Sequence, residues 1–366
     1  MRRLEEEMQK AIADGVFPGA ALLVASQGDI LYRGFFGKAT LLPSPEPVTD
    51  KTLFDIASLT KPVATTTLLQ ISRKEKGTPL NAPVSRYLKA FDDETKKKIT
   101  IRHLLKHTSG LPAWKPYYRE IAQEHPESIG KRESKKYFLE KITQEPLEMP
   151  ISYKHLYSDL GFLLLGFLLE SLWEMPLDQL FSEKVAAPLG LNRTFYRPLE
   201  GIASSIFKTS DFAATEQSSW RKRLIRGEVH DDNAYALGGI AGHAGLFSTI
   251  DDLHRFLSFL EKGLREQDPF LSMELLHEFI GPKMPIKLGW DTPSVSDSQA
   301  GGHFSKNSIG HLGYSGCSFW ADLDKDFHVV LLTNRVHPSS DNETIKVFRP
   351  HLHNVIYEHF IQRQQK

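Results

Sequence analysis

FDIASLTKPV, residues 54–63, carries the most informative pattern in the chain. Ser58 and Lys61 stand three residues apart at the predicted start of a helix, which continues from Ala64 to Lys76 and ends at Gly77. Residues with this spacing share a helix face, so the hydroxyl and the amine can meet. A serine becomes a nucleophile when a neighbouring base takes its proton, and a lysine can be that base if burial lowers its pKa. S-x-x-K also suits a capping serine followed by a solvated lysine, so the pattern alone leaves both interpretations open.

The overall composition indicates an ordinary globular protein without a global electrostatic field. The chain has 366 residues, 40% of them hydrophobic and 25% charged, which suits one large domain or two closely packed regions. Lys+Arg and Asp+Glu number 45 each, so we expect neither nucleic acid nor anionic membrane as a partner. The single cysteine, Cys317, excludes an internal disulfide and a cysteine-based metal cluster, and we expect it to be a packing residue.

No targeting or membrane-spanning segment is predicted. The N-terminal sequence MRRLEEEMQK lacks the apolar core of a signal peptide. The most apolar run, Leu160 to Leu169, is too short to cross a bilayer. We therefore expect a soluble, cytoplasmic protein, unless a signal peptide was removed, which would make it periplasmic or secreted.

Secondary-structure signals predict an α/β (α+β) fold with an antiparallel sheet built from both chain ends. Residues 20–26 and 30–36 flank a turn at residues 27–29, and residues 318–322 and 327–333 form a second hairpin. A first helix covers residues 4–13, and a last one falls between Thr344 and Gln362, broken or kinked at Pro350. We predict one domain, residues 1–366, with an α/β region at about 1–64 and 276–366 and a mostly helical insertion at about 65–275.

Two further stretches could carry chemistry. Tyr157-Ser158-Asp159 precedes a helix, where an aspartate N-cap with a packing aromatic is the default interpretation. The stretch GHLGYSG, residues 310–316, runs into a strand, and its glycines allow close backbone approach. His103 and His107 are four apart, but no glutamate follows the first, so no zinc site is predicted.

Taken in this order and spacing, the three stretches resemble the serine β-lactamase and penicillin-binding protein superfamily. That family has S-x-x-K, then Y-x-N about a hundred residues later, then K-T-G on an edge strand. The closest similarity is to class C β-lactamases and their esterase and D-peptidase relatives. Three further segments are typical of the same family: HTSGLP (residues 107–112), YSDLGFLLLG (157–166) and LLTNRVHP (331–338). The resemblance therefore covers nearly the whole chain. HDDNAYALGGIAGHAGLFST, residues 230–249, resembles a branch linked to bacterial cell-wall turnover.

The resemblance implies a β-lactamase/transpeptidase-like fold, no metal or organic cofactor, and specific site residues. Ser58 would be the acylated nucleophile, and Lys61 with Tyr157 would form the proton-transfer group. The backbone N–H groups of Ser58 and Tyr314 would form the oxyanion hole.

The departures from the family pattern concern substrate recognition. Asp159 stands in place of Asn, which replaces a donor amide by an acceptor-only carboxylate if it is ionised. His311 and Leu312 replace the Lys and Thr of K-T-G, while Gly313 is retained, so binding of a β-lactam carboxylate is in doubt. His230 and Asp231 (with Asn233) either help shape the cleft or lie in a solvated loop.

The sequence therefore predicts a serine hydrolase that cleaves an ester or amide of a small molecule through an acyl-enzyme on Ser58. A small ester, a muropeptide and, as a poor substrate, a β-lactam are the candidates. An amidase acting on peptidoglycan fragments is the main alternative. The second alternative is a sensor that is acylated once and does not turn over. The sequence does not predict the oligomeric state.

Overall fold

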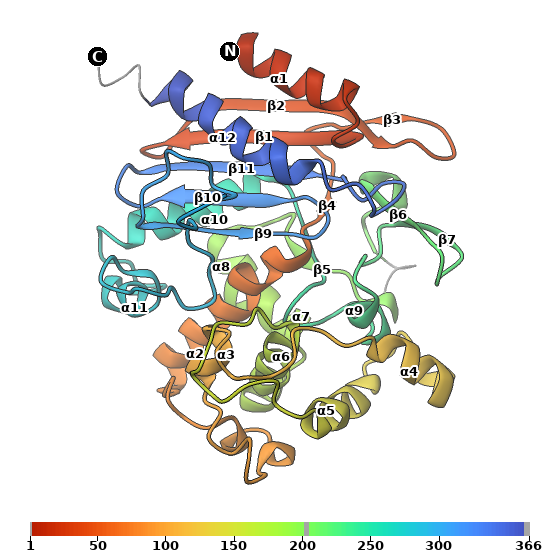
Figure 1. Ribbon diagram of the computed structural model, residues 1–366, viewed down its shortest axis with the longest axis vertical. Coiled ribbons are helices and arrows are strands. Elements are labelled where there is room, and N and C mark those ends of the chain that lie inside the picture. The colour runs from red at the N-terminus through yellow and green to blue at the C-terminus, as the bar shows by residue number, and fades with distance from the viewer. Residues whose placement is uncertain (1, 201–204, 362–366) are drawn as a thin grey trace.

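A six-stranded antiparallel sheet, at the top of Figure 1, is built from both ends of the chain. The computed structural model describes residues 2–200 and 205–361. The strands are β1 (Gly19–Ser26), β2 (Asp29–Thr40), β3 (Glu46–Pro47), β9 (Ser308–Leu312), β10 (Ser318–Asp322) and β11 (Phe327–Thr333). Their order is β3-β2-β1-β11-β10-β9, so the first strand pairs with the last one. The predicted α/β class, its antiparallel sheet and both hairpins are confirmed.

Helices cover both faces of this sheet, and the strands are buried accordingly. α1 (Arg2–Ala13) and α12 (Ile345–Phe360) cover one face, and α10 (Ile250–Gly263) packs against β1 and β11 from the other. Alternate residues of a strand point to opposite faces. Leu22 and Val24 accordingly lie in the core under α1 and α12, whereas Leu23 and Ala25 lie in the larger core on the other side. This explains why β1 is almost uniformly apolar instead of alternating.

The helical region lies below the sheet in Figure 1. Its helices are α2 (Thr67–Lys76), α3 (Ile101–Leu105), α4 (Tyr117–Glu124), α5 (Ser134–Gln144), α6 (Asp159–Trp173), α7 (Leu177–Phe181), α8 (Ala187–Leu189), α9 (Asp232–Ala236) and α11 (Met273–Ile280). α2 ends at Gly77 with φ 63°, as predicted for a left-handed C-terminal glycine. α6 is apolar all round and buried from Leu160 to Leu169, so that run forms the centre of the larger core.

The middle of the chain is less purely helical than predicted. β4 (Phe54–Asp55), β8 (Leu246–Ser248) and β5 (Phe195–Tyr196) form a three-stranded sheet, and β6 (Ala214–Ser218) pairs with β7 (Arg223–Arg226). These strands have two to five residues each and lack a clear alternating pattern, which is why the sequence does not reveal them.

The last helix is continuous through Pro350, so the break that was one of the two predicted outcomes there does not occur. Proline removes the N–H that would bond to the carbonyl of Lys346, four residues earlier. Gln299 Nε2 donates to that carbonyl at 2.9 Å and replaces the missing bond. α12 is assigned from Ile345 to Phe360, and Gln362 lies outside the described residues.

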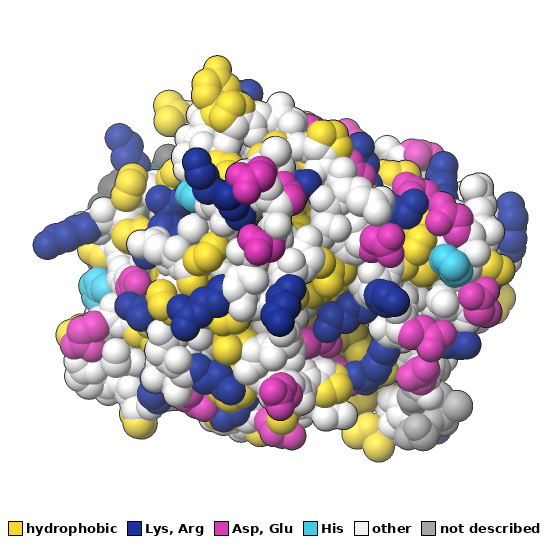
Figure 2. Space-filling view, turned by 90° about the horizontal axis from the view of Figure 1, so that it is seen from below, with side chains coloured by type: hydrophobic (Ala, Val, Ile, Leu, Met, Phe, Trp, Pro, Cys, Tyr) yellow, Lys and Arg dark blue, Asp and Glu magenta, His cyan; other side chains and the backbone are white. Residues whose placement is uncertain are grey.

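The surface carries both signs of charge. On the face shown in Figure 2, basic and acidic side chains are interspersed. Among the described residues, no single helix is long and apolar enough to cross a membrane. The sharply bent pair α6 plus α7–α8 reaches the required length and composition only when the two parts are taken together.

Candidate active site

Ser58 lies in a tight turn that joins β4 to the long helix. A 3₁₀ turn, η1 (Ala57–Leu59), is followed by a π-helical turn, η2 (Lys61–Thr66), and then by α2. Ala57 has φ 47°, a strained value for a non-glycine residue, and its N–H donates to Asp55 Oδ1 at 2.8 Å. The segment therefore begins with a strained turn rather than the regular helix start that was predicted. Strained turns of this kind cluster at active sites.

Lys61 is completely buried and contacts Ser58, as its spacing predicted. Its Nζ donates to Ser58 Oγ at 2.8 Å and to the carbonyl of His243 at 3.3 Å. The same ammonium forms an ion pair with Asp159 Oδ1 at 2.7 Å. The alternative of a solvated lysine behind a capping serine is excluded by this burial.

The pKa of Lys61 is raised, whereas burial alone was expected to lower it. Burial does disfavour the ammonium, but Asp159 and Tyr157 outweigh that effect and raise the pKa of Lys61 above its usual value. In the resting state the lysine is therefore a cation paired with Asp159. It would have to lose a proton before it could accept one from Ser58.

Tyr157 lies beside Lys61, with its ring centroid 4.8 Å from the lysine Nζ. Burial raises the pKa of Tyr157 to about 12. The charge of Lys61 and a hydrogen bond with Ser58 both act to lower the pKa of Tyr157, but burial outweighs them. The ring of His107 packs against Tyr157 at a centroid distance of 4.6 Å. His107 Nδ1 accepts the N–H of Ser158 at 3.0 Å, so this histidine positions the Tyr157 segment.

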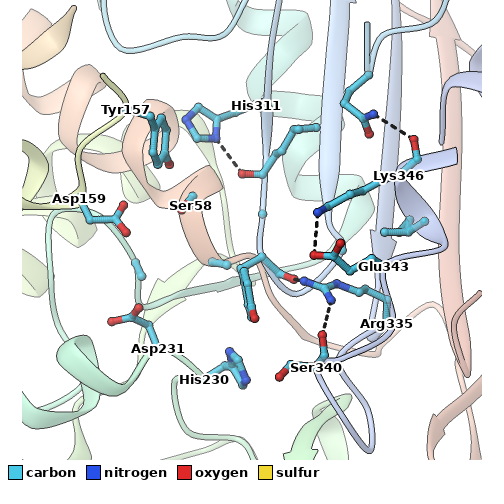
Figure 3. Close-up of a pocket in the computed structure, with 18 of the residues that line it drawn as sticks. Ser58, Tyr157, Asp159, His230, Asp231, His311, Arg335, Ser340, Glu343 and Lys346 are labelled. Atoms are coloured by element: carbon cyan, nitrogen blue, oxygen red, sulfur yellow. Dashed lines mark hydrogen bonds and ion pairs between the residues drawn. The ribbon is translucent and has the colours of Figure 1, made fainter. Parts of the chain in front are cut away.

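Asp159 is not the N-cap of α6, contrary to the default interpretation. Ser158 is the N-cap: its Oγ accepts the N–H of Gly161 at 3.2 Å and donates to the carbonyl of Pro112 at 2.7 Å. Because Ser158 satisfies the helix start, the Asp159 carboxylate is free to reach Lys61 and the cleft (Figure 3).

The predicted oxyanion donor, Tyr314, belongs to the loop between β9 and β10. Gly313 N–H donates to the carbonyl of Cys317 at 2.7 Å, and Gly316 adopts φ 101°. A Cβ at Gly313 would lie 2.7 Å from the carbonyl oxygen of Ile56, so glycine permits the loop to approach the Ser58 turn. Ser315 Oγ donates to the carbonyl of Asp55 at 2.7 Å and ties the two segments together.

His311 borders the cleft but is only 2% exposed. Its Nδ1 lies 2.9 Å from the carbonyl of Leu312, which requires the proton on Nδ1. Burial and the charge of Lys61 lower the pKa of His311, although Asp291 acts in the opposite direction. His311 is therefore neutral near pH 7, and Nε2 then carries a lone pair. The cationic contact to an anionic substrate that the K-T-G comparison left open is not available at neutral pH.

His230 and Asp231 lie on the wall of the cleft, not in a solvated loop. His230 Nε2 is 3.0 Å from Glu216, and its ring stacks on Tyr314 at 5.7 Å. Asp231 Oδ1 pairs with His243 Nε2 at 2.9 Å and caps α9 through the N–H of Ala234. Although burial acts against the charge, His243 holds the pKa of Asp231 below its usual value.

One cleft of ≈ 810 Å³ is lined by Ser58, Tyr157, Asp159, His230, Asp231, His311, Gly313 and Tyr314 (Figure 3). Lys61 is buried behind Ser58 and does not line the cleft. Other residues that line the cleft were not predicted from the sequence: Trp114, Glu216, Asp291, Arg335, Lys346 and Arg349. Only their closeness to family-typical segments could have indicated two of these residues. Trp114 follows HTSGLP by two positions, and Arg335 lies within LLTNRVHP. Among residues 2–200 and 205–361, no three His, Cys, Asp or Glu side chains are placed to hold a metal ion.

This arrangement can support acyl transfer. A serine hydroxyl contacts a buried ammonium, a tyrosine adjoins both groups, and a glycine-containing loop carries backbone N–H groups next to the serine. These are the parts needed for nucleophilic attack, proton transfer and stabilisation of an oxyanion. Cys317 is a weaker candidate nucleophile because burial raises its pKa to about 12.

Comparisons with known proteins agree with this arrangement. The model of the family described as Beta-lactamase matches residues 1–349. The chain is 33% identical over 369 residues to an N-acetylmuramyl-L-alanine amidase of Bacillus subtilis, covering 92% of this chain and 81% of that protein. It is 31% identical over 352 residues to a putative D-alanyl-D-alanine carboxypeptidase of Escherichia coli K12, covering 88% and 79%.

A solved structure extends the comparison to the fold. A class C β-lactamase superposes with a TM-score of 0.71 at 16% identity, covering 97% of this chain and 98% of the other, so the fold is shared. The chain therefore belongs to the Beta-lactamase family and is a serine hydrolase.

Proposed function

We propose that this serine hydrolase is an amidase that cleaves peptidoglycan fragments at the bond between a muramyl lactyl group and a peptide, through an acyl-enzyme on Ser58. The two curated relatives differ in the bond that their names imply. A D-alanyl-D-alanine carboxypeptidase removes a terminal residue and must accept a free carboxylate next to the scissile bond. An N-acetylmuramyl-L-alanine amidase cleaves an internal amide, where the neighbouring carboxyl group is itself part of a peptide bond.

The neutral state of His311 is the observation that favours the amidase. Its Nδ1–H is used by the Leu312 carbonyl, and Asp291 lies beside it on the cleft wall. This position corresponds to the lysine of K-T-G, which engages a substrate carboxylate in β-lactam-cleaving relatives. An internal amide needs no such cation.

The other cations of the cleft are already engaged. Arg335 donates to the carbonyls of Ser340, Asn342 and Tyr314, and Lys346 pairs with Glu343. Arg349 donates to Gln299 and to the carbonyl of Gly316. The described part of the cleft thus offers no unengaged cation for a terminal carboxylate.

In the proposed reaction, the Lys61–Tyr157 pair first releases one proton, and Ser58 Oγ then attacks the lactyl carbonyl as its own proton passes to that pair. The N–H groups of Ser58 and Tyr314 stabilise the oxyanion, a contribution of roughly 3–4 kcal/mol per donor. The amide C–N bond then breaks, and the peptide amine leaves with the transferred proton. Water next attacks the ester, gives a proton to the same pair, and releases the muramyl carboxylate with Ser58 reprotonated.

Mass spectrometry of the products tests the proposal. We expect N-acetylmuramyl-L-alanyl-D-isoglutamine to yield free N-acetylmuramic acid and the dipeptide, and Ser58→Ala to yield neither. Release of D-alanine from a muramyl pentapeptide, with its lactyl amide intact, would instead identify a carboxypeptidase. A stable adduct on Ser58 without turnover would identify a sensor.

A lysine at position 311 supplies an independent test. We expect His311→Lys to raise acylation by a carboxylate-bearing β-lactam about tenfold, because a charge-assisted hydrogen bond contributes roughly 1.5–3 kcal/mol. In the wild type, KM values for anionic and neutral substrates should run parallel from about pH 6.5 upward, where a free imidazole loses its charge. A selective rise of KM for the anionic substrate with pH would contradict the neutral assignment.

A further inference from the structure

We infer that Trp114, Asp231 and Asp232 form a subsite for the pyranose ring of the substrate, a neutral polyhydroxylated group. This inference rests on the proposed function and adds where the sugar half binds. The three residues line the catalytic cleft, as does Asp159, and hydrogen bonds join the segments of Trp114, Asp159 and Asn233, so these residues form one wall.

The three aspartates of this wall share one pattern of polar contacts: a basic side chain lies against Oδ1 of each. Oδ1 of Asp159 pairs with Lys61, Oδ1 of Asp231 with His243, and Oδ1 of Asp232 with Arg221. For Asp159, Asp231 and Asp232 alike, Oδ2 receives no hydrogen bond from any described residue, and it is not among the fully buried atoms. The wall therefore presents three free acceptor oxygens to the cleft.

These acceptors suit hydroxyl groups better than an ammonium. Each carboxylate already has a basic partner on Oδ1, at 2.7 Å, 2.9 Å and 2.8 Å for Asp159, Asp231 and Asp232. Lys61 and Arg221 are cations that balance Asp159 and Asp232, and His243 donates to Asp231, while the lone pairs of Oδ2 remain. A neutral polyol donates O–H groups to such lone pairs without requiring an unbalanced charge.

Trp114 supplies the apolar surface that a sugar ring needs. Its side chain is 45% exposed and lines the cleft, so the indole offers apolar surface to a ligand bound there. The C–H face of a pyranose can pack on the indole while its hydroxyls reach the carboxylates. An acceptor-rich wall beside an aromatic platform matches that amphipathic shape.

The platform is held rigidly next to the carboxylates. The carbonyl of Ala113 accepts the N–H of Asp159 at 2.8 Å, on one side of Trp114. On the other side, Asn233 Nδ2 donates to the carbonyl of Lys115 at 2.8 Å, and Asn233 Oδ1 accepts the N–H of Tyr118 at 3.0 Å. Asn233 directly follows Asp232 and is 1% exposed. Its buried side-chain amide therefore holds the segment around Trp114 next to Asp231 and Asp232.

A matched pair of substrates tests the subsite: N-acetylmuramyl-L-alanyl-D-isoglutamine and the same peptide carrying only a D-lactyl group. In Trp114→Ala and Asp232→Asn we expect KM for the muramyl substrate to rise about tenfold, the equivalent of roughly 1.4 kcal/mol. For the lactyl substrate, KM should change by less than about twofold, which is well below the tenfold rise expected for the muramyl substrate. Tyr153→Ala is the control, because Tyr153 is 76% exposed and does not line the cleft.

Equal losses on both substrates, or none, would overturn the subsite. Calorimetric titration of N-acetylmuramic acid into Ser58→Ala and Ser58→Ala/Trp114→Ala separates this result from failure of the proposed function. If the wild type cleaves neither substrate but the sugar binds in a Trp114-dependent way, the proposed reaction is wrong and the subsite stands. Sugar binding that is equal in both proteins, or Trp114-dependent binding of an amine-bearing peptide instead of the sugar, overturns the subsite.

Discussion

At the scale of single residues, the decisive feature is that Lys61 contacts both a counter-ion and the hydroxyl group that is to be activated. Asp159 lies 2.7 Å away as an ion-pair partner, and Ser58 Oγ lies 2.8 Å away as the group to be activated. With the asparagine of Y-x-N at position 159, the lysine would lack this counter-ion. The aspartate found here therefore changes the resting charge state of Lys61 as well as the surface of the cleft.

Lys61→Ala and Tyr157→Phe should each lower kcat by roughly a hundredfold or more, the usual effect of losing a positioned proton-transfer group. Because the two side chains interact directly, we expect the double variant to lose much less than the product of the single losses. Steady-state kinetics on one substrate measures this. Fully multiplicative losses would show that the two groups act independently.

Asp159→Asn should shift the acidic limb of the kcat/KM profile to lower pH. Asp159 raises the pKa of Lys61, so without it the desolvation of the buried amine dominates and the pKa of Lys61 falls. A neutral Lys61, able to accept the Ser58 proton, would then be present at lower pH. The rate of Ser58 acylation by a fluorophosphonate, followed against pH, checks the sign. An unchanged limb would mean that Tyr157 alone carries the base function.

At the scale of the elements, three segments that are distant in sequence must end at the same point. The Ser58 turn follows β4, Tyr157 and Asp159 start α6, and Tyr314 follows β9. Each junction is fixed by a local bond: Asp55 holds the Ala57 N–H, Ser158 caps α6, and Gly313 bonds to Cys317. Loss of one junction should therefore affect activity beyond its effect on stability.

Ser158→Ala tests this coupling. The hydroxyl caps α6 and also satisfies the carbonyl of Pro112, so its loss should cost roughly 1–3 kcal/mol of unfolding free energy. Because α6 begins with Asp159, we also expect kcat to fall. Ser272→Ala is the matched control, since Ser272 Oγ caps α11 at 3.3 Å and does not line the cleft. Equal changes of kcat in both variants would show that the α6 cap has no particular effect on the active site.

At the scale of the whole molecule, both ends of the chain meet in one sheet, and buried histidines stabilise that assembly only when neutral. His353 on α12 donates from Nδ1 to the carbonyl of Gln299 at 3.0 Å, and burial with the nearby Arg349 lowers the pKa of His353 to about 3. Burial and His328 lower the pKa of His254, on α10, to about 4. Both helices pack on the sheet, so acid weakens its two faces together.

Unfolding free energy should fall as the pH drops from about 6.5 toward 4. An unfolded histidine takes up a proton near pH 6.5, whereas folded His353 remains neutral, so protons favour the unfolded chain throughout this window. Each such group contributes a slope of up to about 1.4 kcal/mol per pH unit. Urea titrations of the wild type and His353→Gln measure it, and the variant should show a shallower dependence. Identical slopes would contradict a neutral buried His353.

The sequence by itself determined the sheet, the hairpins and the contact between Ser58 and Lys61. Residues 318–322 and 327–333 alternate or run apolar over strand lengths, and Gly77 ends a periodic helix, so local rules suffice for them. Ser58 and Lys61 are three residues apart, and the same local geometry brings them into contact.

Only the tertiary structure decided the charge states and the walls of the cleft. The pKa of Lys61 depends on Asp159, almost a hundred positions away, and the neutral state of His311 depends on burial that no local pattern reveals. Likewise, the passage of α12 through Pro350 depends on a hydrogen bond from Gln299. The sequence shows which ionisable groups are present and how far apart they stand along the chain. Their pKa values depend on burial and on neighbouring charges that only folding brings together.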